Sequence, residues 1–276
     1  MSILCIDFMN AAHRARSGFQ AGDFAVVYNF FRQMRALIEQ FKPSRVYVVL
    51  EGRPVKRHEA LAEYKANRIV DEDDPRREGL LKFFKQKDII VDLLNRHVPV
   101  SLIRQPTSEA DDTIANLIRR STTAVEWIVV SSDTDFIQLL QEHDNVRLYN
   151  PVKKEFITPP EYDYVTWKAL RGDSSDNIPG VPGIGDKTAE KIACDPELLH
   201  EVTSRPEVAP IFTRNYELIR FSEWSEDERV TMTCSVPTKN WDAVRQSFNQ
   251  MGFNSITKDG SWEKFMAPFE PLWGEV

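Results

Sequence analysis

The sequence has no long apolar run and only three cysteines, and both absences narrow the class of protein. No apolar stretch approaches the roughly 20 residues that a membrane-spanning helix needs, so we expect no membrane segment. The chain starts almost at once with a strand-like run, without a basic region or cleavage site, so we expect no signal peptide. Cys5, Cys194 and Cys234 are widely spaced. They indicate neither a disulfide framework nor a zinc site, and they are typical of a protein of the reducing cytoplasm.

An excess of positive charge is also absent, since the 276 residues carry a net charge of −7. The composition, 42% hydrophobic and 28% charged, is that of a globular protein with a sizeable core. A negative total argues at first against a nucleic-acid partner. Setting aside the nine clustered carboxylates proposed below as metal ligands turns −7 into +2, so the rest of the chain is slightly basic. The placement of the basic residues is therefore more informative than the total.

Acidic residues follow the strands that the apolar pattern predicts. These strands cover residues 3–6, 46–50, 100–103 and 127–130, and a helical pattern over 24–41 joins the first two into a parallel βαβ unit. One acid at a strand end is usually a solvated loop residue. Acids at the ends of four strands favour a shared functional site, because the carboxyl ends of parallel strands meet at one edge of a sheet. The acids concerned are Asp7, Glu51, Glu109, Asp133 and Asp135.

The densest acidic stretch is Ser108-Glu109-Ala110-Asp111-Asp112, at the start of a predicted helix. One interpretation is structural: Ser108 is the N-cap, Asp111 completes a capping box, and the acids offset the helix dipole. The other is a metal site, because adjacent carboxylates repel one another unless cations neutralise them. Ligands that are all oxygens favour Mg²⁺ or Mn²⁺ over zinc.

Basic residues are concentrated over residues 53–68, which include Lys65 and Arg68. This segment is either a solvated amphipathic helix with internal ion pairs or a surface that contacts phosphates. We interpret residues 69–88, which follow, as an exposed element over the site. The apolar residues at 80–84 have the alternative role of ordinary core.

A glycine-rich stretch contains Gly180, Gly183 and Gly185 and opens a predicted helix at Asp186 or Lys187. Such a hairpin points backbone N–H groups and a helix N-terminus at a phosphate. A plain turn between two helices is the alternative, although it would not need three glycines so close together. In the C-terminal region, about 196–276, five aromatic residues are expected to be mostly core: Trp224, Trp241, Phe248, Phe253 and Trp262.

Five motifs in order resemble the 5′-nuclease (flap endonuclease) family, which includes phage 5′→3′ exonucleases and the 5′-nuclease domain of bacterial repair polymerases. They are Ile6-Asp7, Tyr64-Lys65-Ala66-Asn67-Arg68, Glu109-Ala110-Asp111-Asp112, Ser132-Asp133-Thr134-Asp135-Phe136, and the stretch from Gly172-Asp173 to Gly185. The resemblance covers about residues 1–195. It implies a metal-dependent phosphodiesterase that acts on DNA with free or branched 5′ ends, in replication and repair.

The resemblance also assigns roles to individual residues. It implies two to three Mg²⁺ or Mn²⁺ ions, and Glu51 stands where the family usually has Asp, so that it would ligate directly or through water. Lys65 and Arg68 match residues that contact the scissile phosphate, and Arg14 matches another phosphate contact. The hairpin with Gly183, Gly185 and Lys187 matches a helix–hairpin–helix element that grips duplex DNA and often holds K⁺. The matching metal ligands are Asp7, Glu109 and Asp111 in one region and Asp112, Asp133, Asp135, Asp173 and Asp176 in the other.

The expected fold is therefore α/β, a central and mostly parallel sheet flanked by helices. We expect a PIN-like catalytic domain over 1–165, with a helical arch at about 69–90 through which a single 5′ strand threads. Residues 166–276 would hold the helix–hairpin–helix region and a C-terminal extension. We expect no polymerase domain to follow, and the chain resembles a stand-alone phage enzyme or a small bacterial paralogue. We expect a monomer, active on DNA or on an RNA/DNA hybrid.

Two other functions remain open at this point. A Mg²⁺-dependent phosphatase or sugar transferase using Asp133 and Asp135 explains the acids at the strand ends, but not the glycine hairpin or the basic segment. A non-catalytic relative that only binds branched DNA is the second alternative, and Glu51 in place of Asp is its one hint.

Overall fold

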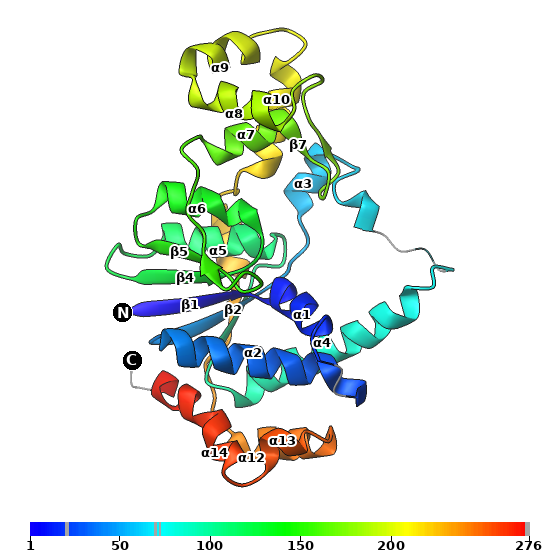
Figure 1. Ribbon diagram of the computed structural model, residues 1–276, viewed down its shortest axis with the longest axis vertical. Coiled ribbons are helices and arrows are strands. Elements are labelled where there is room, and N and C mark those ends of the chain that lie inside the picture. The colour runs from blue at the N-terminus through cyan, green and yellow to red at the C-terminus, as the bar shows by residue number, and fades with distance from the viewer. Residues whose placement is uncertain (20–21, 69–70, 72, 274–276) are drawn as a thin grey trace.

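Strand β1 (Ser2–Asp7) is buried on both faces and lies at the centre of the structure, a computed structural model that describes residues 1–19, 22–68, 71 and 73–273. Its side chains alternate between two cores: Ile3 and Cys5 face one, and Leu4 and Ile6 face the other. A strand covered on both faces by helices is typical of a parallel sheet. Figure 1 shows the helices α1, α2 and α4 on one face of this sheet and α5 and α6 on the other.

Over the described residues, the main sheet has seven strands in the order β6-β5-β4-β1-β2-β3-β9. The five inner strands are parallel, and the two edge strands, β6 and β9, are antiparallel to their neighbours. The four predicted strands are confirmed, and β5 and β6 form an antiparallel hairpin at one edge. The remaining strands of this sheet are β2 (Arg45–Leu50), β3 (Ser101–Arg104), β4 (Glu126–Val130), β5 (Val146–Asn150), β6 (Glu155–Phe156) and β9 (Thr233–Cys234).

Helices cover both faces of the sheet, and the predicted α/β class is confirmed. The predicted helix over 24–41 is α2, and its apolar stripe of large side chains packs into the core. The helices around the sheet are α1 (Phe8–Arg16), α2 (Ala25–Phe41), α3 (Val55–Ala60), α4 (Arg77–His97), α5 (Ala110–Arg119) and α6 (Ile137–Glu142). In the described part of the chain, none of the helices is both long and apolar enough to cross a membrane.

The structural interpretation of the acidic stretch at 108–112 is wrong about the helix cap, although Asp111 and Asp112 do lie in the first turn of the helix. Helix α5 begins at Ala110, and Glu109 stands at its N-cap without a side-chain capping bond. Ser108 is buried and provides no cap. Instead, the carboxylate of Glu51, at the end of β2, accepts a hydrogen bond of 3.2 Å from the N–H of Ala110. Another strand end therefore caps the helix, and the acids of its first turn are left for other contacts.

The predicted arch, residues 69–90, lies partly outside the described residues, because 69, 70 and 72 are not described. From Arg77 onward it is the first two thirds of helix α4. Phe83 is buried and stacks on the His13 ring at a centroid distance of 4.7 Å, whereas Leu81 and Phe84 are exposed. The apolar residues of this segment thus divide between core, for Phe83, and an exposed surface, for Leu81 and Phe84, which are the two roles that the sequence left open.

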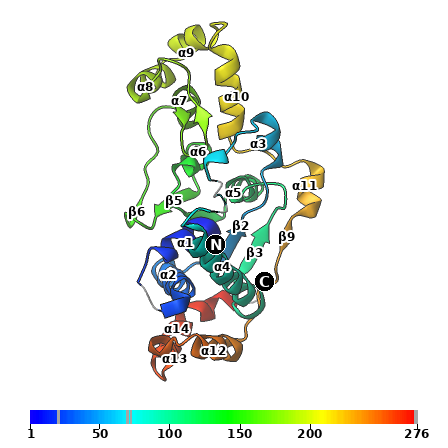
Figure 2. The ribbon, with the colours of Figure 1, turned by 90° about the vertical axis from the view of Figure 1, so that its right-hand side faces the viewer.

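Beyond the sheet, the chain forms a helical group and then returns. Figure 1 shows α7 to α10 stacked beyond α6, on the side of the sheet that α5 and α6 cover, and Figure 2 follows the chain from α10 through α11 and β9 along the sheet to α12. These elements are α7 (Tyr164–Arg171), β7 (Gly172–Asp173), β8 (Ile178–Pro179), α8 (Asp186–Cys194), α9 (Pro196–Thr203), α10 (Ala209–Ile219), α11 (Glu226–Thr231), α12 (Trp241–Gln250), α13 (Asn254–Thr257) and α14 (Ser261–Met266).

The C-terminal helices pack against α2, so that residues 233–272 lie with the sheet rather than with α7 to α10. Phe248, Phe253 and Trp262 belong to the same core as α2, and Trp241 packs against them. Trp224 is buried as well. The prediction that these aromatic residues are core is confirmed.

Candidate functional site

The strand order changes direction between β1 and β4, and this is where ligands bind in open parallel sheets. Asp7 ends β1 and caps α1, because its carboxylate accepts a hydrogen bond of 3.1 Å from the N–H of Asn10. The Ser131 hydroxyl, just past β4, donates to Asp7 Oδ2 at 3.0 Å. Asn10 and Ser132 exchange two further hydrogen bonds, of 2.8 and 3.1 Å. The two strand ends are thereby held together at the middle of the sheet edge.

A cavity of about 840 Å³ opens at this edge. It is bounded by the ends of β1, β2 and β4, the first turn of α5, and the loop after β7. Seven of the nine predicted metal ligands line it: Asp7, Glu51, Asp111, Asp133, Asp135, Asp173 and Asp176. Glu109 is buried beneath this cavity, beside a much smaller one. Asp112 lines a separate cavity on the other side of α5.

Four of these acids, Asp7, Glu51, Asp111 and Asp133, form what we call the unpaired half of the site. Among the described residues, no lysine or arginine nitrogen lies within ion-pair distance of them. Burial, together with the charge of Asp133, raises the pKa of Asp7 to about 6. Burial and the charges of Asp133 and Asp7 also raise the pKa of Asp111. Burial and the charge of Glu109 raise the pKa of Glu51 to about 7, although its side chain is open to the cavity.

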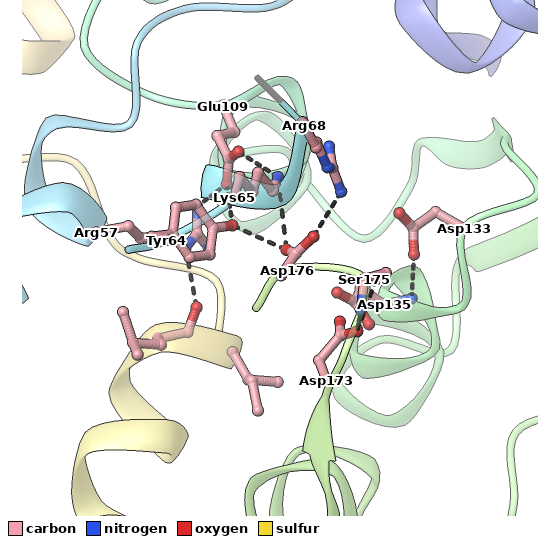
Figure 3. Close-up of polar contacts among 12 residues, drawn as sticks. Arg57, Tyr64, Lys65, Arg68, Glu109, Asp133, Asp135, Asp173, Ser175 and Asp176 are labelled. Atoms are coloured by element: carbon pink, nitrogen blue, oxygen red, sulfur yellow. Dashed lines mark hydrogen bonds and ion pairs between the residues drawn. The ribbon is translucent and has the colours of Figure 1, made fainter. Parts of the chain in front are cut away.

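Four other acids, Glu109, Asp135, Asp173 and Asp176, form the paired half, in which cations of the protein neutralise them. Figure 3 shows Lys65 and Arg68 directed at this group from one side. Lys65 Nζ contacts Glu109 and lies 3.5 Å from Asp176 Oδ2, and Arg68 lies 2.5 Å from Asp176 Oδ1.

Lys168, on α7, supplies the other cation of the paired half. Its Nζ contacts Asp135 and lies 2.7 Å from Asp173 Oδ2. Burial opposes the ionisation of Asp173, but Lys168 and two hydrogen bonds from Ser175 outweigh it and lower the pKa of Asp173 to about 2. Burial likewise acts against ionised Glu109, and Lys65 and Arg57 still hold its pKa below the ordinary value.

The donor set suits a hard divalent cation, because every candidate ligand is a carboxylate oxygen. The raised pKa values of Asp7 and Asp111 indicate negative charge that the protein itself leaves uncompensated. Within the ranges that the structure describes, no group of three or more acidic, histidine or cysteine side chains is close enough together to hold a metal ion as it stands. Holding an ion here therefore requires side-chain rotations, above all in the paired half, where lysine and arginine nitrogens contact the oxygens.

The segment that carries Lys65 and Arg68 is fixed to the loop after β7. The N–H of Lys65 donates to Asp176 O at 3.1 Å, and Asn177 Nδ2 donates to Glu63 O at 2.8 Å. Asn67 Nδ2 donates to the carbonyl oxygens of residues 174 and 175 at 3.1 and 3.3 Å. Lys65 and Asn177 both have positive φ, 55° and 59°, which is uncommon outside glycine. The interpretation of 53–68 as one amphipathic helix is wrong, since only Val55–Ala60 and a 3₁₀ turn at Ala66–Arg68 are helical.

Arg14 lies away from the cavity. It is on α1, its Nε donates to Gln33 Oε1 at 2.9 Å, and it is not among the residues that line the cavity. His13, its neighbour in the sequence, does line it.

The glycine-rich stretch forms a tight turn, in which the N–H of Ile184 donates to Val181 O at 3.1 Å, and α8 begins at Asp186 as predicted. Its glycines serve two purposes. A Cβ on Gly180 would lie 2.1 Å from Arg171 O, so this glycine is needed for packing. Gly183 (φ +80°) and Gly185 face open space, where another molecule can approach their backbone. Lys187 is exposed in the first turn of α8.

The sequence reasoning missed the roles of Lys168 and Arg57. Lys168 precedes Asp173 by five residues at the end of a helix, which is a weak signal on its own. Arg57 was one of several basic residues in the segment 53–68, and nothing in the sequence distinguishes it as the buried one.

Comparisons with known proteins agree with this arrangement. A family model described as the N-terminal resolvase-like domain of 5′-3′ exonucleases matches residues 2–167, and one described as their C-terminal SAM fold matches residues 159–224. A thermostable DNA polymerase I of Thermus filiformis is 35% identical over 179 residues, 62% of this chain and 20% of the polymerase. The DNA polymerase I of Mycobacterium bovis is 30% identical over 215 residues, 69% of this chain and 22% of that protein. The chain thus spans about a fifth of the length of these polymerases.

Solved structures share the fold over nearly the whole chain. A bacteriophage T5 flap endonuclease in a complex with DNA and metal ions gives a TM-score of 0.66 at 17% identity, over 99% of this chain and all of that one. The catalytic core of Rad2 in complex with a DNA substrate gives a TM-score of 0.60 at 14% identity, over 97% of this chain and 92% of that one. Because the first family model alone matches more than half of the residues, this chain belongs to the 5′-3′ exonuclease family.

Proposed function

We propose that this protein is a Mg²⁺-dependent, structure-specific 5′ nuclease, with 5′→3′ exonuclease and flap endonuclease activity, in replication and repair. The observation that carries the proposal is the cavity at the sheet edge, because seven carboxylates line it together with the side chains of Lys65 and Arg68. Acids in this number suit metal-assisted hydrolysis, and the two cations suit a phosphodiester. The substrate class is branched or 5′-ended DNA, and the proposal extends to RNA/DNA hybrids.

Two to three Mg²⁺ or Mn²⁺ ions would be held by the carboxylates. We assign Asp7, Glu51, Asp111 and Asp133 to the first ion, with Glu109 beneath them. We assign Asp135, Asp173 and Asp176 to the second. When bound, such ions lower the pKa of a coordinated water and neutralise charge on phosphate oxygens.

Lys65 and Arg68 would bind the scissile phosphate and stabilise the charge that develops on it. In the structure, Lys65 contacts Glu109 and Arg68 contacts Asp176. When the substrate binds, its phosphate would therefore replace these carboxylates as the partner of the two cations. The contacts of residues 63–68 with the loop at 174–177 hold the backbone of these two residues in place.

The hairpin would grip the duplex next to the cleavage site. The open backbone at Gly183 and Gly185 and the ammonium of Lys187 suit phosphate oxygens, and backbone carbonyls of the same turn would hold K⁺. Arg14 would reach a phosphate only after leaving Gln33. We further infer a cytoplasmic monomer, which size-exclusion chromatography and cell fractionation would test.

The decisive experiment is a gel assay with a 5′-end-labelled flap, with Mg²⁺ and with EDTA, and with a parallel substrate whose flap is RNA. We expect release of a flap-length product only with Mg²⁺. An intact substrate that still shifts on a native gel would favour the non-catalytic binding module. Neither cleavage nor a shift, with phosphate released from a small phosphomonoester, would favour the phosphatase. In the same assay, Lys187→Met should reduce the slope of log Kd against log salt by about 1.

A further inference from the structure

The guanidinium of Arg57, on the short helix α3, is almost fully buried. Its residue is only 8% exposed, although α3 lies at the surface. Nε donates to Leu218 O at 2.9 Å, which ties the group to the end of α10. The two terminal nitrogens contact the two carboxylate oxygens of Asp112, and one of these nitrogens also lies 2.6 Å from Glu109 Oε2. One arginine therefore joins α3, α5 and α10 through a fork of charged hydrogen bonds.

Asp112 is 2% exposed, and both of its oxygens are used by the protein. Oδ1 accepts from Arg57 at 3.0 Å and from the N–H of Ser222 at 2.8 Å, and Oδ2 accepts from Arg57. The next turn of α5 reinforces this arrangement, because Asn116 Nδ2 donates to Ser222 O at 2.7 Å. Asp112 thus faces away from the main cavity, toward the chain that follows α10.

Glu109 lies between Arg57 and the main cavity. Its Oε2 is held by Arg57 at 2.6 Å and lies 2.9 Å from the Tyr64 hydroxyl. Its Oε1 contacts Lys65, which lines the cavity. One oxygen is therefore fixed from behind, and the other is directed to the side on which an ion would be held (Figure 3).

We infer that Arg57 is a positioning residue for the metal ligand Glu109, and that Asp112 serves Arg57 instead of ligating a metal ion. The inference rests on the proposed function, since it needs a metal at the cavity, and it changes one assignment that the sequence favours. Groups that orient a ligand from behind typically contribute tenfold to a hundredfold to metal affinity. A buried guanidinium also requires a buried carboxylate close to it.

The first test measures Mn²⁺ binding by titration calorimetry on the full chain, for the wild type and for Arg57→Met and Arg57→Lys. We expect the Kd for Mn²⁺ to rise roughly tenfold to a hundredfold in both variants, since lysine keeps the charge but not the fork. The Mg²⁺ concentration for half-maximal cleavage should rise in parallel, and saturating Mg²⁺ should restore most of kcat. Lys56→Met is the matched control, because Lys56 lies on the same helix but pairs with Glu228 at the surface. A folded Arg57 variant with an unchanged Kd would overturn the inference.

The second test asks whether Arg57 and Asp112 act as one unit. We expect Asp112→Asn and Arg57→Met to raise the Mn²⁺ Kd by similar factors, and the double variant to be no worse than either. Asp112→Asn raising the Kd while Arg57→Met leaves it unchanged would show that Asp112 is itself a ligand. Each single variant should also lower the melting temperature by roughly 10 °C, because one buried charge loses its partner.

A third variant keeps the test valid if the single variants fold poorly. Arg57→Met/Asp112→Leu replaces the pair by apolar side chains and should recover at least half of the lost melting temperature. Its Mn²⁺ Kd should stay raised, because nothing then holds Glu109 from behind. Recovery of both stability and affinity would overturn the positioning role. Absence of Mn²⁺ binding by the wild type would instead count against the proposed function, so the two failures are distinguishable.

Discussion

The two halves of the carboxylate site solve the same electrostatic problem differently. In the paired half, lysine and arginine side chains neutralise Glu109, Asp135, Asp173 and Asp176. In the unpaired half, Asp7, Glu51, Asp111 and Asp133 have no such partner among the described residues, and burial raises the pKa of Asp7 to about 6. Negative charge that a protein leaves uncompensated must be met by protons or by a bound cation. The unpaired half is therefore where an ion is needed most, and the paired half is where it must displace a cation of the protein.

The largest expected effect comes from Asp111→Asn, in the unpaired half. Mg²⁺-dependent cleavage of the flap should fall by about 10³-fold or more, because one ligand of the ion is lost. The metal-free protein should become more stable, since a buried like charge is removed. Asp133→Asn should behave alike. Asp144→Asn, an exposed acid at the opposite edge of the sheet, is the control. Full cleavage by either site variant would contradict the metal assignment.

In the paired half, Lys65→Met should reduce cleavage by about 10²–10³-fold, because a cation that stabilises the developing phosphate charge is removed. Unlike Asp111→Asn, it should also destabilise the metal-free protein, since Glu109 loses a buried partner. Single-turnover cleavage and urea unfolding in EDTA measure the two effects, with Lys258→Met as a surface control. A variant that loses activity but gains stability would show that the two halves do not differ.

Lys168→Met tests whether the paired half depends on its own cation. Removing one partner of a buried ion pair typically costs about 3–5 kcal/mol, so urea unfolding in EDTA should show a loss of that order. Mg²⁺ should recover part of it, because an ion can then neutralise Asp135 and Asp173 in place of the lysine. Lys191→Met, on exposed α8, should leave stability unchanged. If the Lys168 variant were equally stable with and without Mg²⁺, the ion would not replace the lysine, and the contrast between the two halves would be wrong.

The smallest expected effect is on pH dependence. The pKa of Asp7 is raised in the folded protein, from 3.8 to about 6, so its favourable contribution is present below about pH 4 and is lost as pH rises through 6. The free energy of unfolding in EDTA should therefore fall between pH 5 and 7.5, on the order of 1–2 kcal/mol. Mg²⁺ should flatten this fall, because the ion binds the ionised form. In the paired half, Asp135 adds to this fall, because burial raises its pKa to about 6 despite Lys168, whereas Asp173, with a pKa of about 2, does not titrate in this range. A stability that rises with pH in EDTA would contradict this account.

Particular elements explain how much could be predicted. Strand β1 and helix α2 follow from apolar periodicity, because β1 is buried on both faces and α2 has an uninterrupted apolar stripe that is buried. The acids at the strand ends follow from the same periodicity, since parallel strands bring their carboxyl ends to one edge. Strand β9 could not be predicted, because two exposed residues carry no pattern and pair only where β3 leaves an open edge. The return of α12 to α2 likewise depends on a distant surface.

The roles within the acidic stretch were ambiguous for a related reason. Glu109, Asp111 and Asp112 are neighbours in the sequence, yet they point to three different environments around the first turn of α5. Asp111 reaches the cavity, Glu109 lies beneath it, and Asp112 faces Arg57 behind the helix. Three residues on one turn of a helix spread around its axis, so sequence adjacency could not assign them to one site.

By itself, the sequence determined the α/β sheet, its carboxylate edge and the glycine hairpin, because periodicity, strand-end position and backbone freedom are local properties. Only the tertiary structure decided which acids have a cation of the protein beside them and which do not. That division depends on Arg57, Lys65 and Lys168, which reach the site from α3, the turn after it, and α7. Charge pairing acts over a few ångströms in space, and the folded chain alone brings these groups within that range.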